Sequence, residues 1–125
     1  MRKICFLGLG SNEPTNCYIL KAQALLRSFF PDIVFDRIQR TVPVDFINDK
    51  LFFNQTARCS TLLSIEDMTA ILKQTEKKLG RRPEDKQSGI VRIDIDLLIY
   101  DGKQLKTKEL QRHDIIEGLK RLSQY

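Results

Sequence analysis

The stretch VRIDIDLLIY, residues 91–100, places two aspartates two positions apart within a run of Val, Ile and Leu. The apolar residues predict a strand that packs on a hydrophobic core. Successive side chains of a strand point to opposite faces, so Asp94 and Asp96 are expected on one face with Arg92, Leu98 and Tyr100. The other face is uniformly apolar and consists of Val91, Ile93, Ile95, Leu97 and Ile99. A carboxylate is costly to desolvate without a partner, so the aspartate face is either solvated or covered by a cation.

The segments around this strand predict an alternation of strands and helices. Strands are expected at 2–9, 32–40, 51–61 and 91–100, helices at 14–30, 64–80 and from about 113, and loops at 41–50 and 81–89, the latter mobile. The pair Asp101 and Gly102 predicts a hairpin. This order predicts an α+β fold in one domain over residues 1–125. Its core is a ferredoxin-like βαββαβ antiparallel sheet with helices on one face, followed by a C-terminal hairpin and helix.

The composition is that of a globular protein without a membrane span. The chain has 125 residues, 42% of them hydrophobic and 30% charged, and its N-terminus is interpreted as a strand rather than a signal peptide. The three cysteines are scattered without metal-type spacing, which predicts reduced thiols and a cytoplasmic location. A net charge of +5 suits a phosphate-bearing ligand. No basic run with interleaved aromatics indicates a nucleic-acid surface, so no nucleic-acid partner is expected.

Two aspartates on one face of a strand have Cα atoms about 6–7 Å apart. This spacing allows both to bind one divalent cation, or a pair of cations bridged by phosphates, and Mg²⁺ is commonly held in this way. The alternative is a solvated face on which Arg92 pairs with Asp94. Ahead of the strand, Glu76 and the cations of KKLGRR could hold phosphates from the other side. Cations at a helix C-terminus also complement the helix dipole, which leaves a structural role open.

Two further places offer ligand-binding groups. Thr41, Val44, Phe52 and Asn54 bracket the 41–50 loop and could enclose a flat, hydrogen-bonding heterocycle, although core packing explains the aromatic residues as well. His113 is the single histidine. It is either a surface residue or a phosphate contact.

Five motifs occur in the order found in one enzyme family. They are LGLGSN (7–12), T-x-P-V (41–44), F-x-N (52–54), EKKLGR (76–81) and D-x-D-L-L-x-Y (94–100). Together they resemble the 6-hydroxymethyl-7,8-dihydropterin pyrophosphokinases of folate biosynthesis. The resemblance implies a ferredoxin-like core and transfer of pyrophosphate from ATP to the hydroxymethyl group of the pterin, which leaves AMP. It also implies two Mg²⁺ ions, with ATP as co-substrate.

The resemblance assigns roles to particular residues. Asp94 and Asp96 would hold the Mg²⁺ ions, and with Arg81 and Arg92 they would form the catalytic set. The pterin site would consist of Thr41, Val44, Phe52 and Asn54. The ATP contacts would be Glu76, Arg81, Arg92 and His113. Phosphoryl-type transfer needs charge neutralisation and positioning more than a strong base, which suits a chain with one histidine.

Two positions and the C-terminal segment depart from the family pattern. Arg92 stands one position closer to the first aspartate than in the family, Asp45 follows T-x-P-V in place of glycine, and the C-terminal segment is reduced to RHDIIEGLKRLSQY. These departures leave open a second interpretation. In it, the protein is a catalytically impaired paralogue that acts as a ferredoxin-like module and binds a pterin, a nucleotide or a protein. The orientation of Arg92 discriminates between the two. A shortened sheet edge also favours a homodimer.

Overall fold

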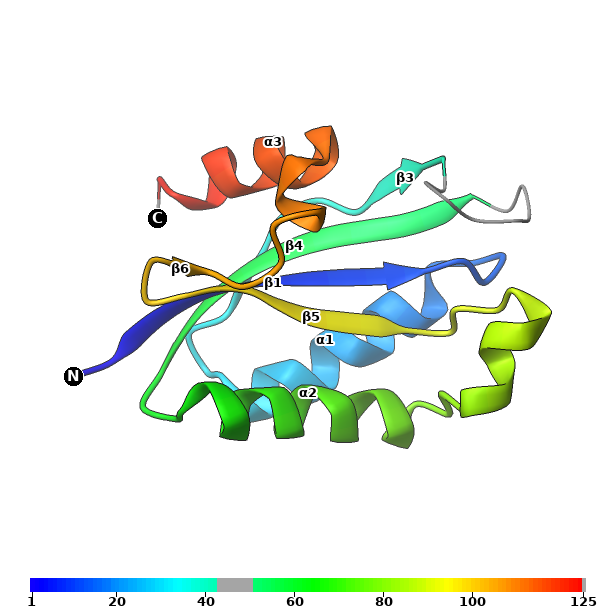
Figure 1. The fold of residues 1–125 in the computed structure, drawn as a ribbon, viewed down its shortest axis with the longest axis horizontal. Helices are drawn as coiled ribbons and strands as arrows, with labels where there is room; N and C mark the ends of the chain where they lie inside the picture. Colours follow the sequence, from blue (N-terminus) through cyan, green and yellow to red (C-terminus); the bar gives the residue numbers. More distant parts are fainter. Residues whose placement is uncertain (43–50, 125) are drawn as a thin grey trace.

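A computed structural model describes residues 1–42 and 51–124 (Figure 1). The chain forms one six-stranded sheet in the order β2-β4-β1-β5-β6, with β3 also pairing with β4, and every pairing is antiparallel. The strands are β1 (Lys3–Ser11), β2 (Val34–Phe35), β3 (Gln39–Thr41), β4 (Phe52–Thr61), β5 (Asp94–Tyr100) and β6 (Lys103–Gln104). The helices are α1 (Cys17–Phe29), α2 (Ile65–Lys78) and α3 (His113–Leu122), with short 3₁₀ helices η1 (Pro83–Ser88) and η2 (Glu109–Gln111). The expected α+β architecture is confirmed.

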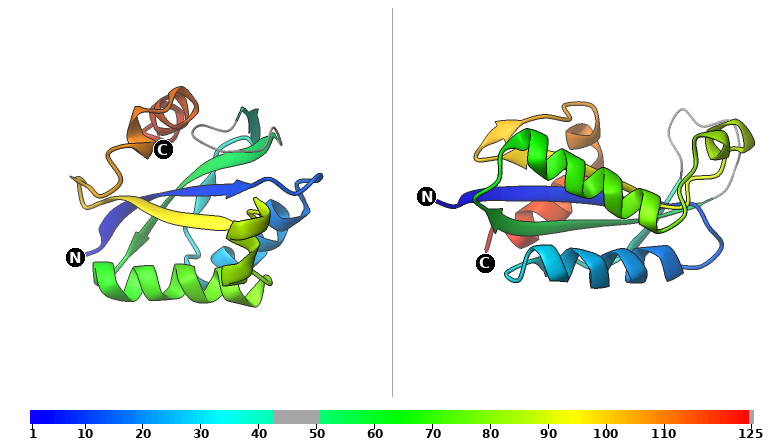
Figure 2. Two further views of the ribbon diagram at one scale, coloured as in Figure 1. Left: turned by 45° about the vertical axis from the view of Figure 1, so that its right-hand side comes forward. Right: turned by 90° about the horizontal axis from the view of Figure 1, so that it is seen from below.

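The core lies between the sheet and the helices α1 and α2. Both helices cover the same face of the sheet (Figures 1 and 2). Their buried stripes meet the inward residues of the central strands; fully buried examples are Leu7, Ile19, Leu26, Met68, Leu72 and Ile95. The second helix begins as expected, because the Ser64 hydroxyl accepts a hydrogen bond from the Asp67 N–H, 3.1 Å away. Among the described residues, no helix is long and apolar enough to cross a membrane.

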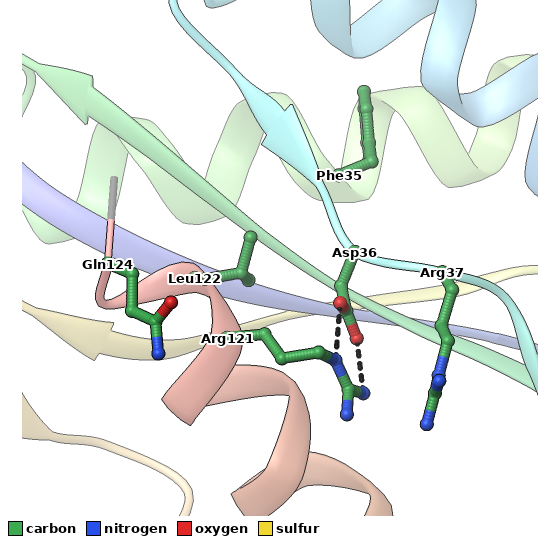
Figure 3. A pocket seen from close by; sticks show the side chains of 6 residues that line it. All are labelled: Phe35, Asp36, Arg37, Arg121, Leu122 and Gln124. Atoms are coloured by element: carbon green, nitrogen blue, oxygen red, sulfur yellow. Dashed lines mark hydrogen bonds and ion pairs between the residues drawn. The ribbon is translucent and has the colours of Figure 1, made fainter.

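The third helix packs on the opposite face of the sheet, against β4 (Figure 1). Arg121 of α3 forms two hydrogen bonds with the carboxylate of Asp36, 2.8 and 2.7 Å long, at the edge of a surface pocket (Figure 3). Arg58 of β4 donates to the carbonyl oxygen of Leu122 over 3.0 Å. Part of the face opposite α1 and α2 is therefore covered by α3 and its connection from β6.

The predicted strand at 32–40 is divided into two short strands. Phe35 pairs with Ala57 and Gln39 pairs with Asn54, so the three residues 36–38 stand opposite the two residues 55–56. An extra residue of this kind bends a strand and interrupts its ladder. At the bend, the Asp36 side chain turns toward α3 instead of continuing the sheet face.

The segment at 81–89, predicted to be a mobile loop, contains the 3₁₀ helix η1 instead. Its Asp85 carboxylate accepts a hydrogen bond from the Arg82 N–H over 3.1 Å. Gly89 ends it with a φ of 68°, a left-handed conformation that glycine adopts without strain. Asn12 then ties the following turn to the end of β1: its side chain donates to the Gly89 carbonyl and accepts from the Val91 N–H, each over 2.7 Å. The strand β5 therefore begins at Asp94, not at Val91.

A bulge in β5 makes the alternation of side chains differ from the one predicted from the sequence. Phe6 pairs with Ile99 but Leu7 pairs with Leu97, so Leu98 has no partner of its own in β1. One extra residue shifts all later side chains to the other face. Tyr100 was expected beside the aspartates, but its hydroxyl donates to the Leu63 carbonyl over 2.7 Å and its ring packs against the core cluster. The predicted hairpin at Asp101 and Gly102 is confirmed, with φ values of 49° and 82°.

Candidate active site

The two aspartates of β5 lie opposite two glycines of β1. In the β1–β5 pairing, Asp94 faces Gly10 and Asp96 faces Gly8. Directly opposite residues share one face of a sheet, so the absence of side chains at both glycines leaves space beside both carboxylates. A hollow of about 70 Å³ lies there, and both aspartates and both glycines line it. The sheet itself thus forms the floor of a site around the carboxylate pair.

The environment shifts the pKa values of the two carboxylates in opposite directions. Burial and the negative charge of Asp94 raise the pKa of Asp96 to about 7. Burial also acts to raise the pKa of Asp94, but hydrogen bonds from Asp96 and Arg81 outweigh it and the net pKa is lowered. At neutral pH, the pair therefore carries less than two full negative charges. A bound divalent cation would relieve the repulsion that raises the pKa of Asp96.

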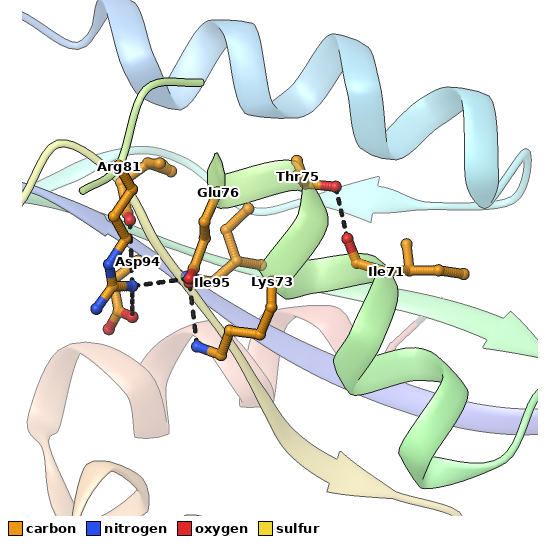
Figure 4. Close-up of polar contacts among 8 residues, drawn as sticks. Ile71, Lys73, Thr75, Glu76, Arg81, Asp94 and Ile95 are labelled. Atoms are coloured by element: carbon orange, nitrogen blue, oxygen red, sulfur yellow. Dashed lines mark hydrogen bonds and ion pairs between the residues drawn. The ribbon is translucent and has the colours of Figure 1, made fainter. Parts of the chain in front are cut away.

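A buried glutamate connects the end of α2 to the start of β5 (Figure 4). Glu76 is almost fully buried and accepts a hydrogen bond from the Ile95 N–H over 2.7 Å. The guanidinium of Arg81 lies 2.9 Å from both Glu76 and Asp94, and it bridges the two carboxylates. Lys73 pairs with Glu76 from the preceding turn of the helix, 3.3 Å away. Glu76 therefore fixes Arg81 beside Asp94.

A larger pocket of about 590 Å³ extends from Asp94 along the end of α2 and η1. Its lining is rich in cations, namely Lys73, Lys77, Arg81, Arg82 and Lys86. Asp94 lines both this pocket and the hollow above the glycines. The two cavities consequently meet at Asp94, with Asp96 on the side of the hollow and a surface rich in cations on the side of the larger pocket.

Three residues assigned to the pterin site lie together on the other side. Phe52 and Asn54 line the hollow with the two aspartates, and the Asn54 amide donates to the hydroxyl of Thr41 on the adjacent strand β3. Val44 lies outside the described residues. The neighbouring Phe53 does not line this hollow; it lies beneath the guanidinium of Arg40, 5.2 Å from its ring centre.

Arg92 and His113 are placed apart from this cluster. Arg92 pairs with the buried Asp85 of η1, with a distance of 2.9 Å between Nε and Oδ2. Arg92 is therefore engaged by Asp85 instead of forming the pair with Asp94 that the sequence left open. His113 is exposed as the first residue of α3, and the hollow is lined from this region by its neighbours Glu109, Arg112 and Ile115.

Several residues of these cavities were not predicted from the sequence, among them Lys73, Asp85 and Arg112. Lys73 lies one helical turn before Glu76, and this spacing could have identified it. The buried Asp85 had no local signal, because its partner Arg92 is seven positions away across a turn. Arg112 belongs to none of the five motifs and stands alone before the predicted helix, so no local pattern marked it.

The residues present fit a magnesium ion that also binds phosphate. Among the described residues, no group of three or more His, Cys, Asp or Glu side chains could hold a metal ion alone. Mg²⁺ is usually held by one or two carboxylates, with the other positions taken by water and substrate phosphates. Asp94 and Asp96 supply such a pair beside a basic pocket that suits phosphates.

Comparison with known proteins relates the whole of this arrangement to one family. The sequence model of the 7,8-dihydro-6-hydroxymethylpterin-pyrophosphokinase (HPPK) family matches residues 6–120. A protein of Aquifex aeolicus (strain VF5) named 2-amino-4-hydroxy-6-hydroxymethyldihydropteridine pyrophosphokinase is 33% identical over 107 residues, which cover 85% of this chain and 66% of that protein. A Bacillus subtilis (strain 168) protein of the same name is 28% identical over 113 residues, which cover 88% of this chain and 67% of that protein. The chain thus spans about two thirds of the length of these relatives, and it belongs to the HPPK family.

Proposed function

We propose that the protein transfers pyrophosphate from ATP to 6-hydroxymethyl-7,8-dihydropterin with the help of Mg²⁺. The substrate hydroxyl oxygen would attack the β-phosphorus of ATP, the bond between this phosphorus and the α–β bridging oxygen would break, and AMP would leave. The hydroxyl proton would pass to solvent. The observation that carries the proposal is the position of Asp94, which lines both the basic pocket and the hollow that also contains Asp96, Phe52 and Asn54.

The basic pocket is the proposed place of the ATP phosphates. Five cationic side chains line it, and phosphates carry the opposite charge. Arg81 is held by Glu76 and Asp94 over 2.9 Å each, so its guanidinium is oriented before a ligand arrives. Preorganised cations of this kind stabilise the charge that develops during phosphoryl transfer without further reorganisation.

The hollow on the other side is the proposed place of the pterin hydroxymethyl group. Phe52 offers an aromatic surface, and Asn54 offers amide groups that match a heterocycle rich in hydrogen-bonding atoms. Asn54 is fixed by its hydrogen bond to Thr41. We propose that Thr41, Val44, Phe52 and Asn54 together form the pterin site.

Mg²⁺, bound by Asp94 and Asp96 together with phosphate oxygens, would neutralise phosphate charge and align the reacting groups. The two aspartates are suited to this role because they point into the same hollow from the same face of β5. We propose two ions, which the pair would share with the phosphates.

The test is to mix the protein with Mg²⁺, ATP and the hydroxymethyl pterin and to measure AMP. We expect AMP to form with wild type, and Asp94→Asn and Asp96→Asn each to lower its rate by at least about 100-fold, since each removes a ligand for the charge-neutralising cation. Asp101→Asn is the matched control, because it removes an exposed carboxylate that follows the same strand and should leave the rate unchanged. Absence of AMP from folded wild-type protein would refute the proposal, and full activity of both aspartate variants would refute the metal assignment.

One observation favours the second candidate, a non-catalytic binding module. Arg92 is engaged by Asp85 rather than directed to the carboxylate pair. Such a module would bind Mg²⁺–ATP or the pterin without forming AMP. Calorimetric titration with a nonhydrolysable ATP analogue separates the two, since a module binds the analogue although the reaction assay stays negative.

We also propose a cytoplasmic location, which fits the three free cysteines, two of them buried. The homodimer expected from the sequence stays a prediction. Analytical ultracentrifugation checks it directly, and a sedimenting species of monomer mass across a wide concentration range would contradict it.

A further inference from the structure

We propose that Arg112 is a phosphate-binding residue of this site and contacts the transferred phosphoryl group from the side of α3. The inference rests on the proposed function and adds to it a residue outside the five motifs. Arg112 would supply the positive charge at the reacting group for which Arg92 was the expected source.

Arg112 lines the same hollow as the carboxylate pair. It is the residue directly before α3, in an extended conformation with φ −72° and ψ 137°. It lines the hollow that contains Asp94 and Asp96, together with Phe52 and Asn54. Among the described residues that line this hollow, Arg112 is the one that carries a positive charge.

The carboxylate of Asp114 holds the guanidinium of Arg112 in a fixed orientation. Its Nε lies 3.1 Å from Oδ1 of Asp114, and its Nη2 lies 2.9 Å from Oδ2. Asp114 is itself largely buried, with 13% of its side chain exposed. A two-point contact of this kind fixes the plane of a guanidinium. Because Asp114 takes Nε and Nη2, Nη1 is the group that remains to contact a phosphate.

The other arginines near the site are engaged elsewhere. Arg92 is paired with the buried Asp85 and does not line the hollow. Arg81 bridges Glu76 and Asp94 on the side of the basic pocket. A phosphoryl group that moves from ATP toward the hollow leaves the cations of α2 behind. Arg112 lines the hollow from the side of α3, so it would add a second positive charge there to that of Arg81.

The alternative is that Arg112 and Asp114 form only a local ion pair at the start of α3. Steady-state kinetics of Arg112→Gln distinguish the two interpretations. We expect kcat to fall by at least about 100-fold, as for the loss of one preorganised donor to a transition state, with a small change in KM for ATP. Arg112→Lys keeps the positive charge but loses the planar guanidinium with its several donors. Its kcat should therefore lie between those of Arg112→Gln and wild type.

Two further variants complete the experiment. Asp114→Asn keeps Arg112 but loosens its orientation, so we expect an intermediate fall in kcat from this positioning residue. Lys120→Gln is the matched control, because it removes an exposed cation from the same helix and should leave kcat unchanged. Circular dichroism and the unfolding midpoint confirm that each variant is folded; if Arg112→Gln is not, Arg112→Lys and Asp114→Asn decide. The inference is overturned if the folded Arg112 variants keep wild-type kcat.

Failure of the proposed function has a different signature. If wild type forms no AMP, inorganic pyrophosphate with Mg²⁺ serves as the probe in calorimetric titration. We then expect Arg112→Gln, but not Lys120→Gln, to weaken binding by at least about tenfold, which is the loss of one charge-assisted contact. Equal affinity of both variants, or no binding by wild type, overturns the inference for Arg112 itself.

Discussion

Glu76 shows at the scale of one residue how a buried charge organises the site. Its carboxylate is buried beneath the start of β5 and accepts the Ile95 N–H over 2.7 Å, and it also faces Arg81 and Lys73. Burial raises the pKa of Glu76 above its ordinary value, although these partners oppose the shift. A buried donor without an acceptor costs free energy, so Glu76 holds both the backbone of β5 and the guanidinium of Arg81.

This position predicts different effects for two substitutions. Glu76→Gln retains an oxygen that can accept from Ile95 and should lower the free energy of unfolding only slightly. Glu76→Ala leaves the Ile95 N–H unsatisfied and should lower it by about 1–3 kcal/mol more. Urea denaturation of both variants measures the difference, and equal stability would show that the Ile95 hydrogen bond contributes nothing.

At the scale of elements, a single glycine of α3, Gly118, allows the helix to approach β4 closely. A Cβ atom at Gly118 would overlap the Thr56 hydroxyl and would lie 3.2 Å from Oδ2 of Asp36. Among the described residues, the buried Thr56 hydroxyl has no hydrogen-bond partner. The helix therefore approaches the sheet closely, and side-chain volume rather than hydrogen bonding limits the approach.

We expect Gly118→Ala to destabilise the protein by about 1–3 kcal/mol, because an overpacked contact forces the helix away from the strand. Thr56→Ala removes the overlapping hydroxyl and should cost little alone, but it should recover part of the loss when combined with Gly118→Ala. Thermal or urea unfolding of the four proteins in this cycle gives the coupling. A stabilising effect of Gly118→Ala, as helix propensity alone would predict, would contradict the close approach.

At the scale of the whole molecule, an ion pair joins α3 to the bend between β2 and β3. Asp36 leaves the ladder between β2 and β3, and Arg121 of α3 reaches it with two hydrogen bonds (Figure 3). Burial acts to raise the pKa of Asp36, but the Arg121 hydrogen bond and the interactions with Arg37 outweigh it, and the net pKa lies below its ordinary value of 3.8. A depressed carboxylate pKa stabilises the folded state above the unfolded pKa, and this stabilisation is lost as the pH falls through the folded pKa.

Asp36→Asn should therefore lower the free energy of unfolding by about 1.5–3 kcal/mol at neutral pH, the usual value of hydrogen bonds to a charged group. The difference from wild type should shrink when the pH falls below the ordinary aspartate pKa, because wild-type Asp36 then becomes protonated. Denaturant titrations over this pH range measure the difference, and Arg121→Gln provides the partner for a double-mutant cycle. A difference independent of pH would refute the contribution of the ion pair.

Local signals account for the parts of the fold that the sequence predicted well. The N-cap at Ser64, the hairpin at Asp101 and the apolar alternation before Leu98 depend on residues near each other in the chain. The aspartate pair and its nearest cation were also identified, because strand periodicity and the adjacent EKKLGR motif are local patterns. Glycines 8 and 10, which create the hollow, belong to the LGLGSN motif, but their position opposite the aspartates depends on strand register.

The sequence by itself determined the order of elements, the two-faced strand β5 and the residues assigned to the phosphates. Only the tertiary structure decided that Arg92 pairs with Asp85, that Arg112 lines the hollow beside the aspartates and that Tyr100 joins the core. Each of these depends on a bulge or on a contact between different elements, which no short pattern in the chain encodes. The strand VRIDIDLLIY thus places two carboxylates on one face of the sheet. The packing of η1 and α3 decides that Arg92 is paired with Asp85 and that Arg112 lines the hollow.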